Sequence, residues 1–199
     1  MRMVGNNRKI DASYIPINVI GVPASGISGL PLGLQELVIS AKRISGSKRL
    51  LKVLIDWWVS NERCNELPEL FETNKTIELI DWLKKRDEET VLLATGDPLW
   101  FGIGRYLLNH FSTGQLIFHP STTSLQEAFA RLERPWQDAV WASLHGRDPD
   151  SLLKLLQKSP NAIGILTDPK KGGANEVREL LKSLDLNDKF SFWIFENLG

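Results

Sequence analysis

Short apolar runs alternate with amphipathic stretches along most of the chain. The runs are rich in β-branched residues and predict buried strands, whereas the amphipathic stretches repeat apolar positions at helical spacing. The predicted strands cover residues 15–22, 42–45, 91–95, 115–119, 138–144, 162–166 and 190–195. The predicted helices cover residues 48–59, 76–85, 106–111, 125–134, 151–157 and 176–184, and a further one carries Leu34, Leu37, Val38 and Ala41. This alternation predicts an α/β protein with at least two parallel units.

The same spacing predicts which helical side chains are buried. Leu51, Leu54, Ile55 and Trp58 form the apolar face of the helix at 48–59, and Ile77 and Ile80, with Trp82 or Leu83, form that of the helix at 76–85. The polar stretch 61–75 predicts an irregular connection. Pro135 is the expected boundary between an N-terminal α/β domain, residues 15–134, and a C-terminal α/β domain, residues 135–199. Residues 1–14 are expected to be a poorly ordered leader.

The strand at 91–95 ends in Gly96-Asp97-Pro98, and two further glycines, Gly102 and Gly104, follow closely. A strand end of this kind projects a carboxylate and bare backbone amides beyond the carboxyl edge of a sheet, where open α/β folds bind ligands. A strand, a turn and a helix with a solvated Asp97 is the alternative interpretation of the same residues.

A second predicted strand end carries hydroxyl groups. Ser121, Thr122, Thr123 and Ser124 lie directly before the helix predicted at 125–134. They offer hydrogen-bond donors and helix N-cap residues for a ligand, although capping alone explains one or two of them. The first predicted loop, residues 23–30, contains neither a Gly-x-Gly-x-x-Gly nor a Gly-Lys-Ser/Thr pattern, so dinucleotide-binding and P-loop interpretations are weak.

The composition of the chain disfavours several classes of function. The 24 Lys and Arg balance the 24 Asp and Glu, so no global basic field favours nucleic acid and any anion site is local. The single cysteine, Cys64, excludes an internal disulfide framework and offers no zinc spacing, which favours a reducing cytoplasm. No apolar run approaches the roughly 20 residues that span a bilayer, and the leader lacks the apolar region of a signal peptide.

Several stretches of the chain occur in the same order in a known family. The Pro-Trp-Gln-Asp and Ser-Leu-His-Gly-Arg stretches are diagnostic of one branch, whereas the Gly-Asp-Pro loop is common to the superfamily. The matching stretches are Thr95–Pro98 with Phe101–Arg105, His119–Gln126, Ala128–Leu132, Pro135–Asp138, Ser143–Arg147, Leu166–Pro169 and Glu196–Gly199. On these motifs the chain resembles the tetrapyrrole (corrin/porphyrin) methylases of cobalamin biosynthesis, and within them the branch that methylates C5.

The resemblance implies a two-domain α/β tetrapyrrole methylase fold, that of the class III S-adenosylmethionine methyltransferases, with the cofactor in a cleft between the domains. It implies methyl transfer from S-adenosylmethionine, without a metal, to C5 of a precorrin or cobalt-precorrin. It also implies a cytoplasmic homodimer that acts on neither nucleic acid nor membrane. A separate or fused partner that methylates C15 and decarboxylates the substrate is expected, because that half is not in this sequence.

The resemblance further assigns residues to the site. Arg105, Arg131 and Arg147 are candidates for the carboxylates of the substrate, since a guanidinium binds a carboxylate in a bidentate manner, and a solvated surface charge is the alternative for each. His145 is a candidate base for a proton of the methylated carbon, because histidine titrates near ~6.5, or else a structural residue of the turn. The candidates for cofactor binding are Thr95, Gly96, Asp97, Trp100, Thr123, Ser124, Leu144, Leu166 and Thr167.

Two features depart from the family pattern. The first loop reads Gly21-Val22-Pro23-Ala24-Ser25-Gly26, where relatives carry more glycine, and Pro23 removes an amide donor. The chain also ends at Gly199, where relatives continue, so the C-terminal domain is expected to be truncated. Another tetrapyrrole C-methyltransferase and a non-catalytic corrinoid-binding module remain as alternative functions.

Overall fold

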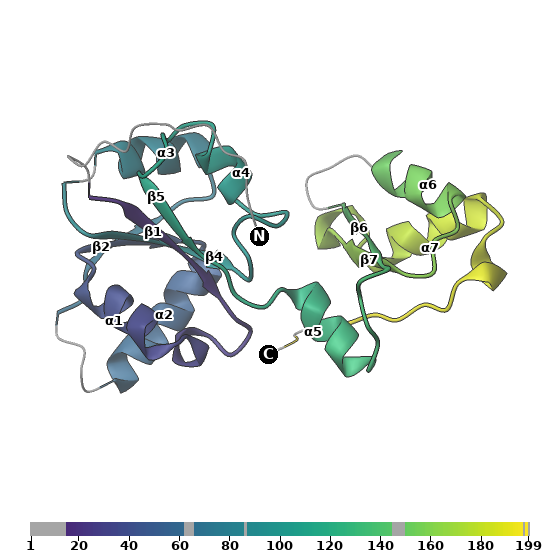
Figure 1. Cartoon of the computed structure of the whole chain (residues 1–199), viewed down its shortest axis with the longest axis horizontal. Coiled ribbons are helices and arrows are strands. Elements are labelled where there is room, and N and C mark those ends of the chain that lie inside the picture. Colours follow the sequence, from purple (N-terminus) through teal and green to yellow (C-terminus); the bar gives the residue numbers. More distant parts are fainter. Residues whose placement is uncertain (1–14, 62–65, 86, 145–149, 197, 199) are drawn as a thin grey trace, which may run out of the picture. The chain divides into compact units, whose positions relative to one another are not determined.

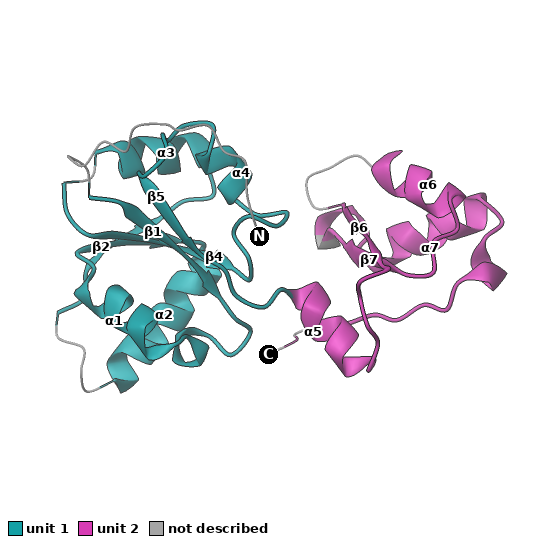
Figure 2. Cartoon of the chain, in the orientation of Figure 1, with its two compact units in different colours: residues 1–123, 199 teal, residues 124–198 magenta. Residues whose placement is uncertain are grey.

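A computed structural model describes residues 15–61, 66–85, 87–144, 150–196 and 198. Two compact units make up the chain, one ending at Thr123 and the other running from Ser124 to Leu198 (Figure 2). The division falls before the helix that precedes Pro135, because Phe129 of that helix packs edge-to-face on Trp141 of the second unit at 5.4 Å between ring centroids. The leader predicted at residues 1–14 lies outside the described residues.

The first unit is built on a parallel sheet of five strands. They are β1 (Ile17–Val22), β2 (Arg43–Gly46), β3 (Glu69–Glu72), β4 (Thr90–Thr95) and β5 (Leu116–His119). Their order across the sheet is β3-β2-β4-β1-β5, and every neighbouring pair is parallel. The strands β1 and β4 therefore form the centre of the sheet, with Val22 in register with Thr95.

Helices cover both faces of this sheet (Figure 1). The helices α1 (Leu32–Ser40) and α2 (Lys48–Ser60) lie on one face, and α3 (Thr76–Lys84) and the short α4 (Gly104–Leu107) lie on the other. Alternation along β1 divides its side chains between the two cores, with Ile20 and Val22 packed toward α2, and Ile17 and Val19 packed toward α3. Burial on both faces is the reason why these strands are continuous apolar runs in the sequence.

The second unit contains a parallel pair of strands, β6 (Val140–Ser143) and β7 (Ile163–Leu166). Its helices are α5 (Ser124–Arg131), α6 (Asp150–Gln157) and α7 (Ala174–Ser183), and short 3-10 turns lie at Ile27–Gly29 in the first unit and at Pro169–Lys171 and Asn187–Lys189 here. The core joins Ala142 and Leu144 with Leu152, Val177 and Leu181. The α/β fold class and the parallel pairing agree with the sequence prediction.

Five local predictions are wrong. The helix predicted at 106–111 is the short α4, which ends at Leu107. The segment predicted as a strand at 190–195 belongs to no described sheet, and Phe192, Trp193 and Ile194 within it are exposed. The connection predicted at 61–75 contains the strand β3. Ile55 and Ile77 are 37% and 70% exposed, because the apolar faces of α2 and α3 are centred instead on residues that include Leu50 and Leu79.

Candidate functional site

The chain segments that follow the two central strands, β1 and β4, run toward opposite sides of the sheet. The connection from β1 runs through α1 toward β2, whereas that from β4 runs through α4 toward β5 on the other side of β1. Because α1 and α4 pack on opposite faces of the sheet, they do not cover the space between the ends of β1 and β4. The fold therefore places the loops after Val22 and Thr95 at the position where open α/β sheets bind ligands.

Backbone hydrogen bonds join three strand ends at this edge. The Gly96 amide donates to the Val22 carbonyl at 3.0 Å, and the Ser121 amide donates to the Gly96 carbonyl at 3.2 Å. A Cβ atom on Gly21 would collide with the carbonyl oxygen of Gly96. The loops after β1, β4 and β5 are thus held together through Gly96.

Gly96 also needs to be a glycine for its own backbone. Its φ is 62°, in the left-handed region that L side chains rarely adopt, and a Cβ atom there would lie 3.2 Å from both the Thr122 carbonyl oxygen and the Thr123 Cα. Among the predicted site residues, Gly96 and Thr123 are therefore neighbours. Their closeness brings together the Gly-Asp-Pro and Ser-Thr-Thr-Ser strand ends that the sequence indicated separately.

Asp97 begins a tightly folded loop. Its Oδ1 accepts a hydrogen bond of 2.8 Å from the Leu99 amide, and its carbonyl accepts one of 3.2 Å from the Trp100 amide. The side chain is half-buried and has a second carboxylate oxygen. Asp97 therefore stabilises the turn, as the alternative interpretation expected, and retains a charged acceptor at the carboxyl edge.

The rest of this loop folds over the carbonyl of Pro98. That oxygen accepts from the Gly104 amide at 2.8 Å, and a Cβ atom on Gly102 or Gly104 would come within 2.6 or 2.7 Å of it. Phe101 has a φ of 53°, unusual for a non-glycine residue, and its ring packs against Trp100 at 5.0 Å. Residues in such rarely populated backbone conformations occur often at ligand-binding sites.

Thr95 is the last residue of β4, and its hydroxyl is engaged by a residue that the sequence did not single out. The guanidinium Nη2 of Arg49, in the first turn of α2, donates to Thr95 Oγ1 at 3.0 Å. Arg49 lies 46 positions from Thr95, so no local pattern in the sequence could have paired them. Thr123, also predicted, is buried.

The first loop folds in spite of Pro23. The Gly26 amide donates to the Pro23 carbonyl at 3.0 Å, which closes a turn before the buried Ile27. The side chain of Gln35, 8% exposed, donates to the Leu30 carbonyl at 2.8 Å and holds the end of this loop on α1. The Pro23 carbonyl thus accepts the hydrogen bond that closes the turn, and this bond does not use the amide that proline lacks.

The predicted basic residues differ in their surroundings. Arg105 is exposed at the start of α4 and makes no ion pair with another described residue. Arg131, in the second unit, is engaged locally, since it contacts Glu127 Oε2 at 3.5 Å and the Leu198 carbonyl at 3.3 Å. His145 and Arg147 lie outside the described residues.

The other predicted residues belong to the second unit. Ser124 opens α5, Leu144 directly follows β6, and Leu166 and Thr167 lie at the end of β7. The Leu144 amide donates to the Leu166 carbonyl at 2.8 Å, and the Leu144 side chain is fully buried, so only backbone at this position can face a ligand. Beyond Thr167, Asp168 accepts from the Lys170 amide at 3.0 Å and begins a 3-10 turn.

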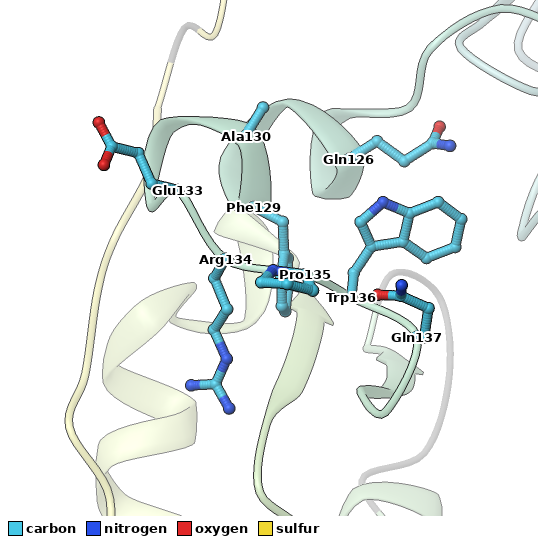
Figure 3. A pocket seen from close by; sticks show the side chains of 8 residues that line it. All are labelled: Gln126, Phe129, Ala130, Glu133, Arg134, Pro135, Trp136 and Gln137. Atoms are coloured by element: carbon cyan, nitrogen blue, oxygen red, sulfur yellow. The ribbon is translucent and has the colours of Figure 1, made fainter.

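The second unit also carries a pocket of about 550 Å³, formed by α5 and the segment that follows it (Figure 3). Phe129, Pro135 and Trp136 supply its apolar lining, and Arg134 donates to the Asn161 carbonyl at 2.9 Å. None of the described residues that line it is among those predicted to bind cofactor or substrate. The lining residues are Gln126, Phe129, Ala130, Glu133, Arg134, Pro135, Trp136 and Gln137.

Three further features bear on function, namely the surroundings of His119, groups that could hold a metal, and helices that could cross a membrane. Burial lowers the pKa of His119 at the end of β5 and so favours its neutral form, and its Nε2 lies 2.9 Å from Asn18 Oδ1. In the part of the chain that the structure describes, no group of three or more His, Cys, Asp or Glu is arranged to hold a metal ion. Nor does any helix in that part combine the length and apolarity needed to cross a membrane.

Comparison with known proteins gives one consistent result. The family model for tetrapyrrole (corrin/porphyrin) methylases matches residues 16–199. The chain is 28% identical over 167 residues to a precorrin-6Y C(5,15)-methyltransferase of a Sinorhizobium species, of which the match covers 38%. It is 33% identical over 104 residues to a cobalt-precorrin-7 C(5)-methyltransferase of Salmonella typhimurium, of which the match covers 50%. The chain therefore spans half or less of these two relatives.

A longer match and a solved structure extend the comparison. A probable cobalt-precorrin-7 C(5)-methyltransferase of Methanocaldococcus jannaschii is 27% identical over 190 residues, which cover 92% of this chain and 83% of the relative. The crystal structure of a precorrin-6Y methylase from Archaeoglobus fulgidus aligns with 77% of this chain and 73% of that one, with a TM-score of 0.54 and 25% identity. A cobalt precorrin-4 methyltransferase, with a TM-score of 0.63 and 16% identity, shares the fold.

Proposed function

Because the chain belongs to the tetrapyrrole methylase family, we propose that it transfers a methyl group from S-adenosylmethionine to C5 of a precorrin or cobalt-precorrin in cobalamin biosynthesis. The observation that carries this proposal is the edge at which Gly96 joins the ends of β1, β4 and β5 beside the Asp97 carboxylate. The names of the relatives from Sinorhizobium, Salmonella and Methanocaldococcus supply the position on the macrocycle.

The residues at this edge fit the methionine portion of the cofactor. That portion carries an ammonium group, which needs an anionic acceptor, and the carboxylate of Asp97 has one oxygen beyond the one that accepts from Leu99. Thr95 and Thr123 add hydroxyl groups close to Gly96. In our proposal Thr95, Gly96, Asp97, Trp100 and Thr123 therefore contact the cofactor.

Positioning is the main task that the chemistry leaves to the protein. S-adenosylmethionine supplies a methyl group that its sulfonium already makes electrophilic, and C5 of the macrocycle is the nucleophile. Holding two reactants in near-attack geometry can be worth about 7–11 kcal/mol. The joint at Gly96 would orient the cofactor, and Leu99 and Trp100, which follow Asp97 in the loop and are partly exposed, would exclude water from it.

Further parts of the proposal concern substrate and partners. Arg105 faces solvent at the start of α4 and is suited to a carboxylate of the macrocycle, whereas Arg131 would first have to leave Glu127. We propose a homodimer, which the exposed Trp136 and Trp193 of the second unit support as apolar interface residues. A protein or further domain that methylates C15 would complete the reaction named for the Sinorhizobium relative.

Titration calorimetry with S-adenosylhomocysteine tests the proposal and separates an enzyme from a corrinoid-binding module. Saturable binding with a stoichiometry of about one per chain is expected. Heat only from a corrinoid, with none from S-adenosylhomocysteine, would instead favour the binding module.

A further inference from the structure

Arg49 lies at the carboxyl edge of the sheet, and the proposed function gives it no role. Arg49 lies three residues after the end of β2. Its Nη2 donates a hydrogen bond of 3.0 Å to Oγ1 of Thr95, the last residue of β4. Thr95 directly precedes Gly96 and Asp97. The contact therefore fixes a guanidinium beside the loop that we propose to hold the cofactor.

The charge of Arg49 is not neutralised within the described part of the chain. Arg43 pairs with Glu69 at 3.1 Å and Arg131 with Glu127 at 3.5 Å, whereas Arg49 is exposed and contacts only a neutral hydroxyl. A guanidinium stays protonated at all ordinary pH values and has five N–H donors in a planar fork. One donor positions the group on Thr95, which leaves others for a ligand.

We propose that Arg49, positioned by Thr95, binds a carboxylate of the ligand at this edge. The inference rests on the proposed function, whose two reactants both carry carboxylates: the methionine portion of the cofactor carries one, and the macrocycle carries several on its acetate and propionate side chains. Thr95, which holds the guanidinium, and Asp97 directly precede and follow Gly96 in the chain, so a cation and an anion are available at this edge for the two charges of an amino-acid zwitterion. A carboxylate at the rim of the macrocycle would meet the same guanidinium.

The experiment measures dissociation constants for three probes with the full chain. S-adenosylhomocysteine carries the amino-acid carboxylate, 5′-methylthioadenosine is the same nucleoside without it, and uroporphyrin is a polycarboxylated tetrapyrrole. The variants are Arg49→Ala, Thr95→Val and, as a matched control, Lys52→Ala, which removes an exposed cation one turn further along α2. The melting temperature of each variant shows whether the fold is intact.

Arg49→Ala is expected to weaken the binding of a carboxylate probe by about ten- to a hundredfold, as for a charge-assisted hydrogen bond, and to leave 5′-methylthioadenosine unchanged. A loss confined to S-adenosylhomocysteine assigns the carboxylate of the cofactor, and a loss confined to uroporphyrin assigns that of the macrocycle. Thr95→Val is expected to weaken the binding of the same probe because it removes the tether of Arg49, and it also removes the contact with the cofactor that we propose for Thr95. Lys52→Ala is expected to match the wild type.

Two outcomes would overturn the inference, and they are distinguishable. If the wild type binds S-adenosylhomocysteine and Arg49→Ala binds every probe equally well, only the role of Arg49 fails. The role also fails if Lys52→Ala weakens binding as much as Arg49→Ala, since the effect is then one of net charge. If the wild type binds neither S-adenosylhomocysteine nor uroporphyrin, the proposed function fails together with the inference.

Discussion

The Gly96 amide donates a hydrogen bond of 3.0 Å to the Val22 carbonyl, which ties the loop after β4 to the end of β1. Through the same residue, the Gly96 carbonyl receives the Ser121 amide at the end of β5. Because the connections after β1 and β4 run toward opposite sides of the sheet, this joint stands at the switch point where open α/β folds bind ligands. A single glycine therefore sets the geometry of the proposed cofactor site.

Gly96→Ala is expected to destabilise the first unit by about 1–3 kcal/mol, since alanine at a positive φ is strained and its Cβ would press on Thr122 and Thr123. Urea denaturation measures the effect. The control is Gly33→Ala in the first turn of α1, where a Cβ atom meets nothing within 4 Å. That variant is expected to be neutral or stabilised by up to about 1 kcal/mol. Equal stability of the two variants would contradict the proposed joint.

Asp97 is predicted to have two roles that two substitutions separate. Asp97→Asn keeps an oxygen that accepts from the Leu99 amide but removes the charge, whereas Asp97→Ala removes both. Both variants are expected to bind S-adenosylhomocysteine about ten- to a hundredfold more weakly. Only Asp97→Ala is expected to lose stability, by about 1 kcal/mol. Wild-type affinity in Asp97→Asn would reduce Asp97 to a turn residue.

Glu69 is expected to make the first unit sensitive to acid. Hydrogen bonds from the Trp82 indole at 2.8 Å and from Arg43 at 3.1 Å lower the pKa of Glu69 below its usual 4.5. Because the native pKa is the lower one, the unfolded state binds more protons, and this stabilisation is lost as the pH falls below about 4.5.

Glu69→Gln can still accept from Trp82 but cannot titrate. Its unfolding free energy is therefore expected to fall less steeply than that of the wild type as the pH drops, when both are measured by urea denaturation. The difference is expected to be small, since the Glu69 side chain is 57% exposed. Parallel pH profiles would contradict this role for Glu69.

Local pattern was sufficient to predict most elements of the fold. Strands such as β1 and β4 are continuous apolar runs because both of their faces are buried, and the Gly96-Asp97 loop follows from where β4 ends. The strand β3 escaped prediction because its sequence, Glu-Leu-Phe-Glu, is short and ends in charges. Pairing with β2 and the contacts of Glu69 with Arg43 and Trp82 stabilise it, and these are invisible to a local window.

At residues 190–195 the sequence predicted a strand that the structure does not show. Its aromatic and β-branched residues have high strand propensity, yet a strand also requires a neighbour with which to pair its backbone, and the described residues provide none there. The contact of Arg49 with Thr95 was missed for a related reason, because only the placement of α2 after β2 brings the two side chains together.

The proposed methylation of a precorrin at C5 can be tested by incubation with isotopically labelled S-adenosylmethionine. The chain is mixed with a precorrin-6Y or cobalt-precorrin-7 substrate, and the product is examined by mass spectrometry and NMR. One labelled methyl group, bound at C5, is expected in the product, and the product yield is expected to fall in Asp97→Asn. A substrate recovered without label, under conditions in which S-adenosylhomocysteine binds, or a label at another ring carbon, would contradict the claim.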